Sequence, residues 1–500
     1  MPIFKRSSPR GRPVCSLAAI GLWMAGAAQA ATLQVNPSGS DFGNCQATAC
    51  QTIGYALGQA GASGDTLQVA AGTYTEQLTI NKSVAVVGAG SSATLIQAPA
   101  ALATNPAVPG GSAGQKTAIV FVTGASTTAQ MRDLQVRGPG SSACGSLGYG
   151  VFVGGNATFT LDGARLTAIR DNPLAGCQNG TAVRFGAPNP SQVGSGAVLN
   201  SVIDDFQKNG ITVSNTGSNV TVRGNIVTGT LPAPVIAQNG IQVSSGAVAV
   251  VQSNTVSNLQ CSPSNPNCGP NGSWSIGILL VDAGSGTQVS GNQIRNADAG
   301  LYAFGSMTSA PTIPLSANEI ASSVYANLVA EGATLDMTDN TLTGAPVGLL
   351  ASGDGGGPTT VHLSGGNVIT GATTAGIGTK AGDPNQAITV SGQHNQFTHN
   401  AIGANNLPAA AATFQLPCNW WGTETGPANP ANPLGTGNAA SADVTYTNWS
   451  IDNTRFLCVG NPQRNEAIAH PPAPVPADAP WALVAAALAL AGLGARRFRG

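Results

Sequence analysis

The sequence predicts an all-β fold, in which one parallel β-helix is built from stacked coils. Three observations predict it: few charges, many glycines and a pattern that recurs along most of the chain. Charged residues make up 8% of this 500-residue chain, whereas ordinary soluble domains carry about 25%. Gly 66 and an apolar fraction of 42% favour a large core of short strands joined by turns over a helical bundle.

Short apolar strands that begin at a small residue recur about every 28 residues. They start at Gly150, Gly180, Gly210, Gly240, Gly277, Gly300, Asn327, Gly348, Gly376 and Ala401. The one long interval contains Cys261 and Cys268, which indicates an insertion loop closed by its own disulfide. A propeller blade needs roughly 40 to 45 residues, so this shorter period predicts a solenoid of roughly twelve coils.

A series of asparagines keeps step with these strands. Its members are Asn225, Asn254, Asn292, Asn318, Asn340, Asn367 and Asn395. Asparagine tolerates the left-handed conformation and bonds its own backbone, which suits tight corners. Equivalent side chains on coils about 4.8 Å apart can also form a ladder of amide hydrogen bonds. We therefore expect these residues at the corners, with their amides stacked.

The stretch from Gln51 to Gly90 predicts how the solenoid begins. Gln51 to Ala60 is amphipathic, and a helix there would cover the open edge of the first coil. Strand-like segments follow at Gly64 to Val69 and from Leu78 onward. The whole stretch resembles the opening of the pectin-lyase-like superfamily of single-stranded, right-handed parallel β-helices. Cys418-Asn-Trp-Trp-Gly422 is similar to a closing segment of its secreted members.

The resemblance implies a fold and leaves the function open. The superfamily includes polysaccharide lyases, glycoside hydrolases, epimerases and surface proteins without demonstrated activity. A fold of this kind hosts many functions, so the function has to be argued from a site.

The N-terminal end carries the features of an exported protein. Four basic residues precede the apolar run Cys15 to Ala28, and Ala28-Gln29-Ala30 supplies the small residues that a signal peptidase needs. Residues 1–30 are therefore predicted to be a signal peptide, cleaved between Ala30 and Ala31.

The C-terminal end indicates a sorting tail. A Pro-rich linker at residues 459–480 precedes the apolar run and basic stop of residues 481–500, although fifteen apolar residues fall short of the ~20 that a spanning helix needs. Val475-Pro-Ala-Asp-Ala-Pro-Trp481 resembles the IPTL-CTERM signal at Val475, Pro476 and Trp481, and the related PEP-CTERM signal stays open. The resemblance implies a bacterial envelope, cell-surface or extracellular protein with a transient membrane anchor, and envelope sorting machinery as a partner.

Three segments lie between the two ends. We expect the N-terminal cap and first coils at residues 31–100, the β-helix repeats at 101–405 and a C-terminal cap at 406–458. Seven of the 20 basic residues belong to the signal and the tail, so the body holds 13 basic against 21 acidic residues. This acidic body disfavours nucleic acid as a partner.

Eight cysteines follow the predicted signal, and an even number in an exported protein indicates disulfides. Proximity in the sequence pairs Cys45 with Cys50, Cys144 with Cys177, Cys261 with Cys268, and Cys418 with Cys458. A zinc site is the alternative, but the sequence has no Cys-x-x-Cys. We therefore predict no metal site, and we interpret His394 and His399 as turn residues.

The early coils hold most of the charge. Twelve charged residues fall between Arg132 and Arg223, whereas residues 224–379 contain one basic residue. A lyase needs a cation to neutralise a uronate carboxylate and a base to remove a proton. The candidates for these roles are Arg170, Arg184 and Lys208, with Asp171, Asp204 and Asp205 as calcium ligands. For Asp204-Asp205, a solvated turn is the favoured interpretation.

Of the motifs of polygalacturonase-type members of the superfamily, the sequence has only an Asp-Asp, at Asp204-Asp205. The sequence has neither the Gly-His-Gly and Arg-x-Lys of polygalacturonases nor the Trp-x-Asp-His of pectate lyases. We therefore predict a noncatalytic, exported surface protein, adhesin-like or glycan-contacting, with an extracellular polysaccharide as its partner and no cofactor. The alternative is a polysaccharide lyase or a related uronate-acting enzyme, with calcium as its cofactor.

Overall fold

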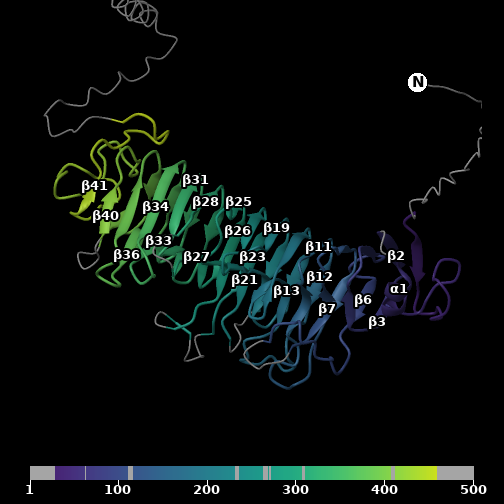
Figure 1. Ribbon diagram of the computed structural model, residues 1–500. Coiled ribbons are helices and arrows are strands. Elements are labelled where there is room, and N and C mark those ends of the chain that lie inside the picture. Colours follow the sequence, from purple (N-terminus) through teal and green to yellow (C-terminus); the bar gives the residue numbers. More distant parts are fainter. Residues whose placement is uncertain are drawn as a thin grey trace, which may run out of the picture.

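The computed structural model describes residues 29–61, 64–110, 116–230, 236–262, 268–269, 272–306, 310–406 and 412–458. These residues form one elongated stack of coils with the first and last strands at opposite ends (Figure 1). The predicted right-handed parallel β-helix is confirmed. The predicted linker and tail, and the signal up to residue 28, lie outside the described residues. Within the described residues, no helix is both long and apolar enough to cross a bilayer.

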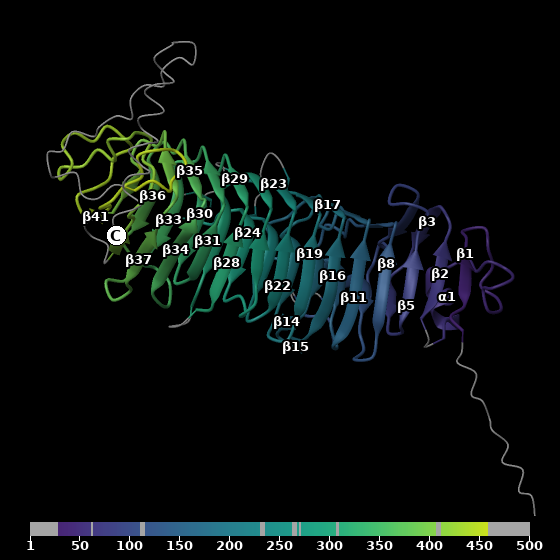
Figure 2. The same ribbon diagram turned by 90° about the horizontal axis from the view of Figure 1, so that it is seen from above.

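Three long parallel sheets run along the stack, and Figure 2 shows their strands side by side. Sheet A has, in spatial order, β1 (Thr32–Val35), β2 (Asp65–Val69), β5 (Val84–Val87), β8 (Thr128–Arg132), β11 (Ala157–Asp162), β16 (Gly194–Leu199), β19 (Asn219–Arg223), β22 (Val248–Gln252), β25 (Gln288–Ser290), β28 (Thr312–Ser316), β31 (Thr334–Thr338), β34 (Thr359–Gly365), β37 (Ile388–Gly392), β40 (Ala412–Gln415) and β41 (Val444–Thr445).

Sheet B has β3 (Gly72–Thr75), β6 (Thr94–Gln97), β9 (Gln135–Arg137), β12 (Arg165–Thr167), β17 (Val202–Asp204), β20 (Ile226–Thr228), β23 (Thr255–Leu259), β26 (Gln293–Ala297), β29 (Glu319–Ala321), β32 (Thr341–Thr343), β35 (Val368–Thr370) and β38 (Gln396–Thr398).

Sheet C has β4 (Leu78–Ile80), β7 (Ala118–Val122), β10 (Tyr149–Val153), β13 (Thr181–Phe185), β18 (Asn209–Ser214), β21 (Asn239–Ser244), β24 (Ile276–Val281), β27 (Ala299–Phe304), β30 (Ala326–Glu331), β33 (Val347–Ser352), β36 (Ala375–Lys380) and β39 (Ala404–Asn405). β14 (Ala187–Pro188) and β15 (Ser191–Gln192) form a small antiparallel hairpin. Within the described residues, sheets B and C have twelve strands each, which confirms the expected number of coils.

The recurring residues lie in one inward column of sheet C, where a Cβ added to a glycine such as Gly277 or Gly300 would lie less than 3.0 Å from an atom of a neighbouring coil. The same column accommodates Asn327 opposite Gly300. The register pairs Tyr149 with Thr181, so Ala182, and not Gly180, is the counterpart of Gly150. At the other end Gly403, and not Ala401, lies against Gly376. The series predicted from the sequence is therefore two residues out of register at these two places. Each misplaced residue is small as well, and period alone does not distinguish between such neighbours.

The asparagine ladder is confirmed, and it lies inside the coils. Each side-chain Nδ2 donates to the Oδ1 of the asparagine on the next coil, at 2.8–3.0 Å. The asparagines do not adopt the left-handed conformation themselves. The residue before each one does, as at Ser253 (φ 54°), Ala317 (φ 53°) and His394 (φ 62°). The left-handed residue turns the chain, and the asparagine side chain then points inward and bonds across the coils.

The predicted helix at the first coil is α1 (Ile53–Gln59), which is shorter than the expected Gln51 to Ala60. Thr52 caps its start by accepting from the Tyr55 N–H. Glu76 accepts from the N–H groups of the first turn, and Lys82 donates to carbonyls of the last turn. These two side chains complement the helix dipole from both ends. Burial raises the pKa of Glu76, while the two N–H groups of the helix act in the opposite direction.

All four predicted disulfides are formed. Their Cα–Cα distances are 5.1 Å for Cys45–Cys50, 5.9 Å for Cys144–Cys177, 5.7 Å for Cys261–Cys268 and 5.4 Å for Cys418–Cys458, within the usual range. The last one lies in the closing segment, where Asn419 continues the asparagine ladder and Trp421 is fully buried.

Candidate functional site

The charged residues of the early coils pair with one another. Arg170 Nε lies 2.7 Å from Asp205 Oδ1 in the corner between sheets B and C, and Arg165 Nε lies 3.1 Å from Asp204 Oδ2 on sheet B. Asp204 ends β17, and Asp205, with φ 47°, forms the turn after it. The pairing satisfies these groups locally.

The side chains of the other early candidates take no part in these ion pairs. Asp171 is fully buried and accepts from the Gly145 N–H and from Gln207 Nε2, both at 3.1 Å. Arg184 donates to the Gly186 carbonyl and covers the Tyr149 ring, 5.9 Å from its centre. The three aspartates therefore have separate partners, and no calcium site is formed from them within the described residues. Of all the early candidates, only Lys208 lines the groove described below.

The groove lies on the outer face of sheet C. Loops join sheet B to sheet C at one corner of each coil, and the long ones belong to the early and middle coils, where they project together from one side of the stack (Figure 1). The Cys144–Cys177 disulfide ties two of them, and Cys261–Cys268 closes the one between β23 and β24. Two of these loops line the groove: the one between β20 and β21 through Ala237, and the one between β23 and β24 through Gly272, Ser273 and Trp274.

Outward side chains of sheet C form columns that run from coil to coil. One column reads Thr212, Gln242, Leu279, Tyr302, Val329 and Leu350, and another reads Ser214, Ser244, Val281, Phe304, Glu331, Ser352 and Lys380. The first column changes from polar to apolar between β21 and β24. A separate apolar cluster therefore lies outside the core, on this face.

The groove crosses these columns diagonally and has a volume of about 570 Å³. It starts at Lys208, ahead of β18, and ends at Lys380, the last residue of β36. Its floor and walls are formed by Asn239, Ser273, Trp274, Ile276, Leu279, Tyr302, Val329, Glu331, Leu350 and Ser352. The five coil steps from β21 to β36 span about 24 Å at ~4.8 Å each. The site is therefore long and narrow, and it suits an extended ligand.

An insertion loop presents the largest aromatic side chain of the groove. Trp274 stacks on Tyr325 with ring centres 5.0 Å apart, and its Nε1 donates to the Gly269 carbonyl. Asp298, which is buried, fixes both ends of the loop by accepting from the Cys261 and Ser275 N–H groups at 2.8 Å. Burial raises the pKa of Asp298 above its usual value, and these two hydrogen bonds only partly oppose the rise. The loop thereby holds the Trp274 ring in place before any ligand arrives.

Paired polar groups line the far half of the groove. Tyr302 Oη donates to Glu331 Oε2 at 2.6 Å, and Lys380 Nζ lies 2.6 Å from Asp354 Oδ2. Burial and the Glu331 carboxylate raise the pKa of Tyr302, so the phenol stays protonated. The Lys380 ammonium lowers the pKa of Asp354. Each pair leaves lone pairs and N–H groups for the hydroxyl groups of a ligand.

Lys208 is the one groove cation with no carboxylate partner among the described residues. Its Nζ donates to the Ala237 carbonyl at 2.8 Å. Burial lowers the pKa of Lys208 to about 8, from the usual 10.5. The amine therefore titrates near pH 8.

We expect Lys208→Met to stabilise the protein at pH 7. The unfolded chain holds the lysine proton up to pH 10.5 and the folded chain only to about 8. Below pH 8 the buried charge therefore lowers the free energy of unfolding of the wild-type protein by its full amount. As the pH rises from 8 to 10.5, the wild-type protein regains this stability. The free energy of unfolding should rise by roughly 1–3 kcal/mol at pH 7, and the gain should vanish near pH 10.5. Urea titrations at both pH values measure it, with Lys116→Met as control. An increase in the free energy of unfolding that is the same at both pH values would contradict the lowered pKa of Lys208.

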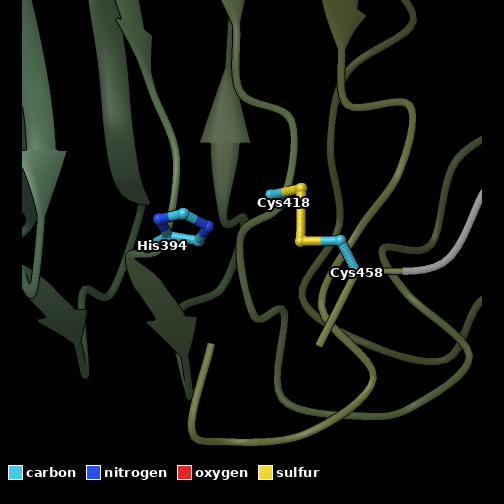
Figure 3. Close-up of side chains that lie close together, drawn as sticks. All are labelled: His394, Cys418 and Cys458. Carbon is cyan, nitrogen blue, oxygen red and sulfur yellow. A yellow bond between two sulfur atoms is a disulfide. The ribbon is translucent and has the colours of Figure 1, made fainter. Parts of the chain in front are cut away.

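Histidine and two cysteines also meet near the closing segment. Ligand atoms of His394, Cys418 and Cys458 lie within 4.8 Å of one another (Figure 3). The two sulfurs are bonded to each other, so neither is a thiolate that could hold a metal. His394 and His399 both adopt positive φ, as the interpretation as turn residues requires. The group is a structural part of the closing segment.

The sequence matches the family described as right handed beta helix region over residues 118–320 and 192–368, just over half of the chain. The chain belongs to this β-helix family. The matched residues include strands β7 to β34 and most of the groove. A comparison with curated proteins finds no match.

Solved structures share the fold at low identity. The periplasmic alginate epimerase AlgG is 10% identical, with 71% of this chain and 76% of that chain covered and a TM-score of 0.48. The A-module of mannuronan C-5 epimerase AlgE4 from Azotobacter vinelandii is 16% identical, with 72% and 92% covered and a TM-score of 0.45. The catalytic domain of a GH87 α-1,3-glucanase is 14% identical, with 73% and 64% covered and a TM-score of 0.41. These similarities concern the fold alone.

Proposed function

We propose that this β-helix is an exported, envelope- or matrix-associated protein that binds an extended polysaccharide along the diagonal groove, without cleaving it. The single observation that carries the proposal is the aromatic-lined groove that runs across the coils from β21 to β36. Sugar rings present apolar faces to aromatic side chains, and their hydroxyl groups need polar partners nearby. The groove offers both.

The shape of the groove supports a chain as its ligand. It is open along the sheet and about 24 Å long, at ~4.8 Å per coil, whereas a site for a small molecule encloses most of its ligand. The stacked Trp274 lies in the early half, and the Tyr302–Glu331 and Lys380–Asp354 pairs lie beyond it. Successive sugar units can therefore meet different partners along the floor.

Export rests on the terminal segments and on the disulfides. Four disulfides in one chain fit an oxidising compartment such as the periplasm or the cell exterior. The predicted signal peptide would direct the chain to such a compartment. There the sorting tail would serve as a transient membrane anchor and be recognised by sorting machinery of the envelope.

Trp274→Ala tests the proposal. We expect the variant to bind polysaccharide at least about tenfold more weakly, because it loses a preorganised stacking surface. Affinity electrophoresis in gels that contain a neutral glucan or an acidic uronan measures the binding. Phe42→Ala is the matched control, since Phe42 is an aromatic residue 81% exposed at the first coil, far from the groove. Equal retardation of both variants in every gel, or none for the wild-type protein, contradicts the proposal.

A uronate-acting lyase is the second candidate, and Lys208 favours it. An amine with a pKa of about 8, facing a polysaccharide groove, can accept a proton near neutral pH. Incubation with acidic polysaccharides, with and without calcium, would then give an unsaturated product that absorbs in the ultraviolet. If the wild-type protein forms this product and Lys208→Ala does not, the protein is a lyase. If the protein binds the polysaccharide and no product forms, the noncatalytic proposal is supported.

A further inference from the structure

A buried carboxylate faces the first strand at the start of the stack. Asp65, the first residue of β2, is 5% exposed. Its Oδ1 accepts from the Ala31 N–H and its Oδ2 from the Gly61 N–H, both at 2.7 Å. Within the described residues, Asp65 has no lysine or arginine partner. A buried carboxylate without a cation is costly, so a cation at this position would be favoured.

The sequence places a processing signal at the same nitrogen. Ala28-Gln29-Ala30 is the small-residue pattern of a signal-peptidase site, and the bond that follows it is Ala30–Ala31. Ala30 is exposed and precedes β1, whereas Ala31 is partly buried. The sequence pattern and the geometry are independent, and both point to Ala31.

We propose that the chain is processed between Ala30 and Ala31 and that the new α-ammonium group of Ala31 docks on the buried Asp65 carboxylate. Hydrolysis adds one water: the carbonyl carbon of Ala30 gains an oxygen and becomes a carboxylate, and the nitrogen of Ala31 becomes an ammonium. The hydrogen bond to Asp65 then becomes a charge-assisted ion pair, which is stronger than a neutral one.

Neighbouring cleavage positions do not give this contact. Cleavage before Gln29 or Ala30 leaves the Ala31 nitrogen as an amide. Cleavage before Thr32 removes Ala31, whose carbonyl also accepts from the Thr66 N–H at 2.8 Å at the start of the β1–β2 pairing. Only the bond between Ala30 and Ala31 leaves β1 complete and turns the nitrogen at Asp65 into a cation. Processing would therefore complete the first coil.

The test uses the full chain, exported from a bacterial host, and two backgrounds. The first is the natural sequence, and the second carries Gly-Ser inserted between Ala30 and Ala31, so that processing leaves Ala31 as an amide. N-terminal peptide masses should show Ala31 first in one and the inserted Gly first in the other. Asp65→Asn should lower the melting temperature by about 2 to 4 °C more in the natural background than in the insertion background.

A second measurement keeps the proposal testable if Asp65→Asn fails to fold. The α-amine of Ala31 should react with an acylating reagent several times more slowly than that of the inserted Gly, because Asp65 holds it protonated. A mature N-terminus other than Ala31 overturns the processing site. Equal losses of melting temperature in the two backgrounds, or equal acylation rates, overturn the docking.

Discussion

We expect Asn292→Ala to lower the free energy of unfolding by about 3 kcal/mol or more, which is a larger loss than any surface substitution should cause. Asn292 is fully buried in the asparagine ladder. Its Oδ1 accepts from the Asn254 backbone and side chain, and its Nδ2 donates to the Val251 carbonyl and to Asn318 Oδ1. Alanine leaves all of these groups short of a partner in the dry core.

Two further asparagine variants serve as comparisons for the loss expected in Asn292→Ala. Asn225, at the start of the ladder, accepts from the Ser201 N–H and, within the part of the chain that the structure describes, from no asparagine, so Asn225→Ala should cost less. Asn385 is exposed and, among the described residues, its hydrogen bonds go to Asp383, two residues earlier, so Asn385→Ala should change little. Urea titration at neutral pH measures all three. Equal losses for Asn292→Ala and Asn385→Ala would show that the ladder does not stabilise the fold.

The fold could be predicted because every coil repeats the same local demands. The inward column of sheet C favours small residues, and the ladder inside the coils needs an asparagine directly after each left-handed residue, so both recur with the coil period and are visible in the sequence. The disulfides follow from proximity, since stacked coils bring equivalent corners together, as for Cys144 and Cys177. The conformation of the asparagines was not predictable in this way. Period shows which residues recur, but it does not show which of two neighbours carries the left-handed turn.

The groove could not be predicted from charge density. Charge is densest between Arg132 and Arg223, but the structure pairs several of these residues with one another. The groove draws on residues from Lys208 to Lys380, which only the register of sheet C brings together. The sequence does carry a signal for the groove. The residue two places after each member of the inward column points outward, and this residue changes from Gln242 to the apolar Leu279 and stays apolar or aromatic through Leu350.

Gly300→Ala carries the second large effect that we expect. Gly300 lies in the inward column, two residues before Tyr302 on the floor of the groove. A Cβ there would lie 2.2 Å from Ile320 Cγ2 and 2.7 Å from the Asn327 carbonyl oxygen. Ile320 is β-branched and buried, and the carbonyl belongs to strand β30, so neither can move aside cheaply. The free energy of unfolding should fall by about 3 kcal/mol, at the upper end of overpacking effects.

The control separates crowding from the loss of a glycine. Gly58 lies in α1, and a Cβ there meets nothing within 4 Å, so Gly58→Ala should be neutral or stabilising by up to about 1 kcal/mol. Similar melting temperatures for the two variants would rule out crowding as the reason for the glycines. We expect a clear difference, because the preceding position of the column is crowded as well: a Cβ on Gly277 would lie 2.4 Å from the Gly300 carbonyl. A shift of β27 therefore cannot relieve one contact without tightening the next, and the displaced strand carries Tyr302 out of its place in the groove.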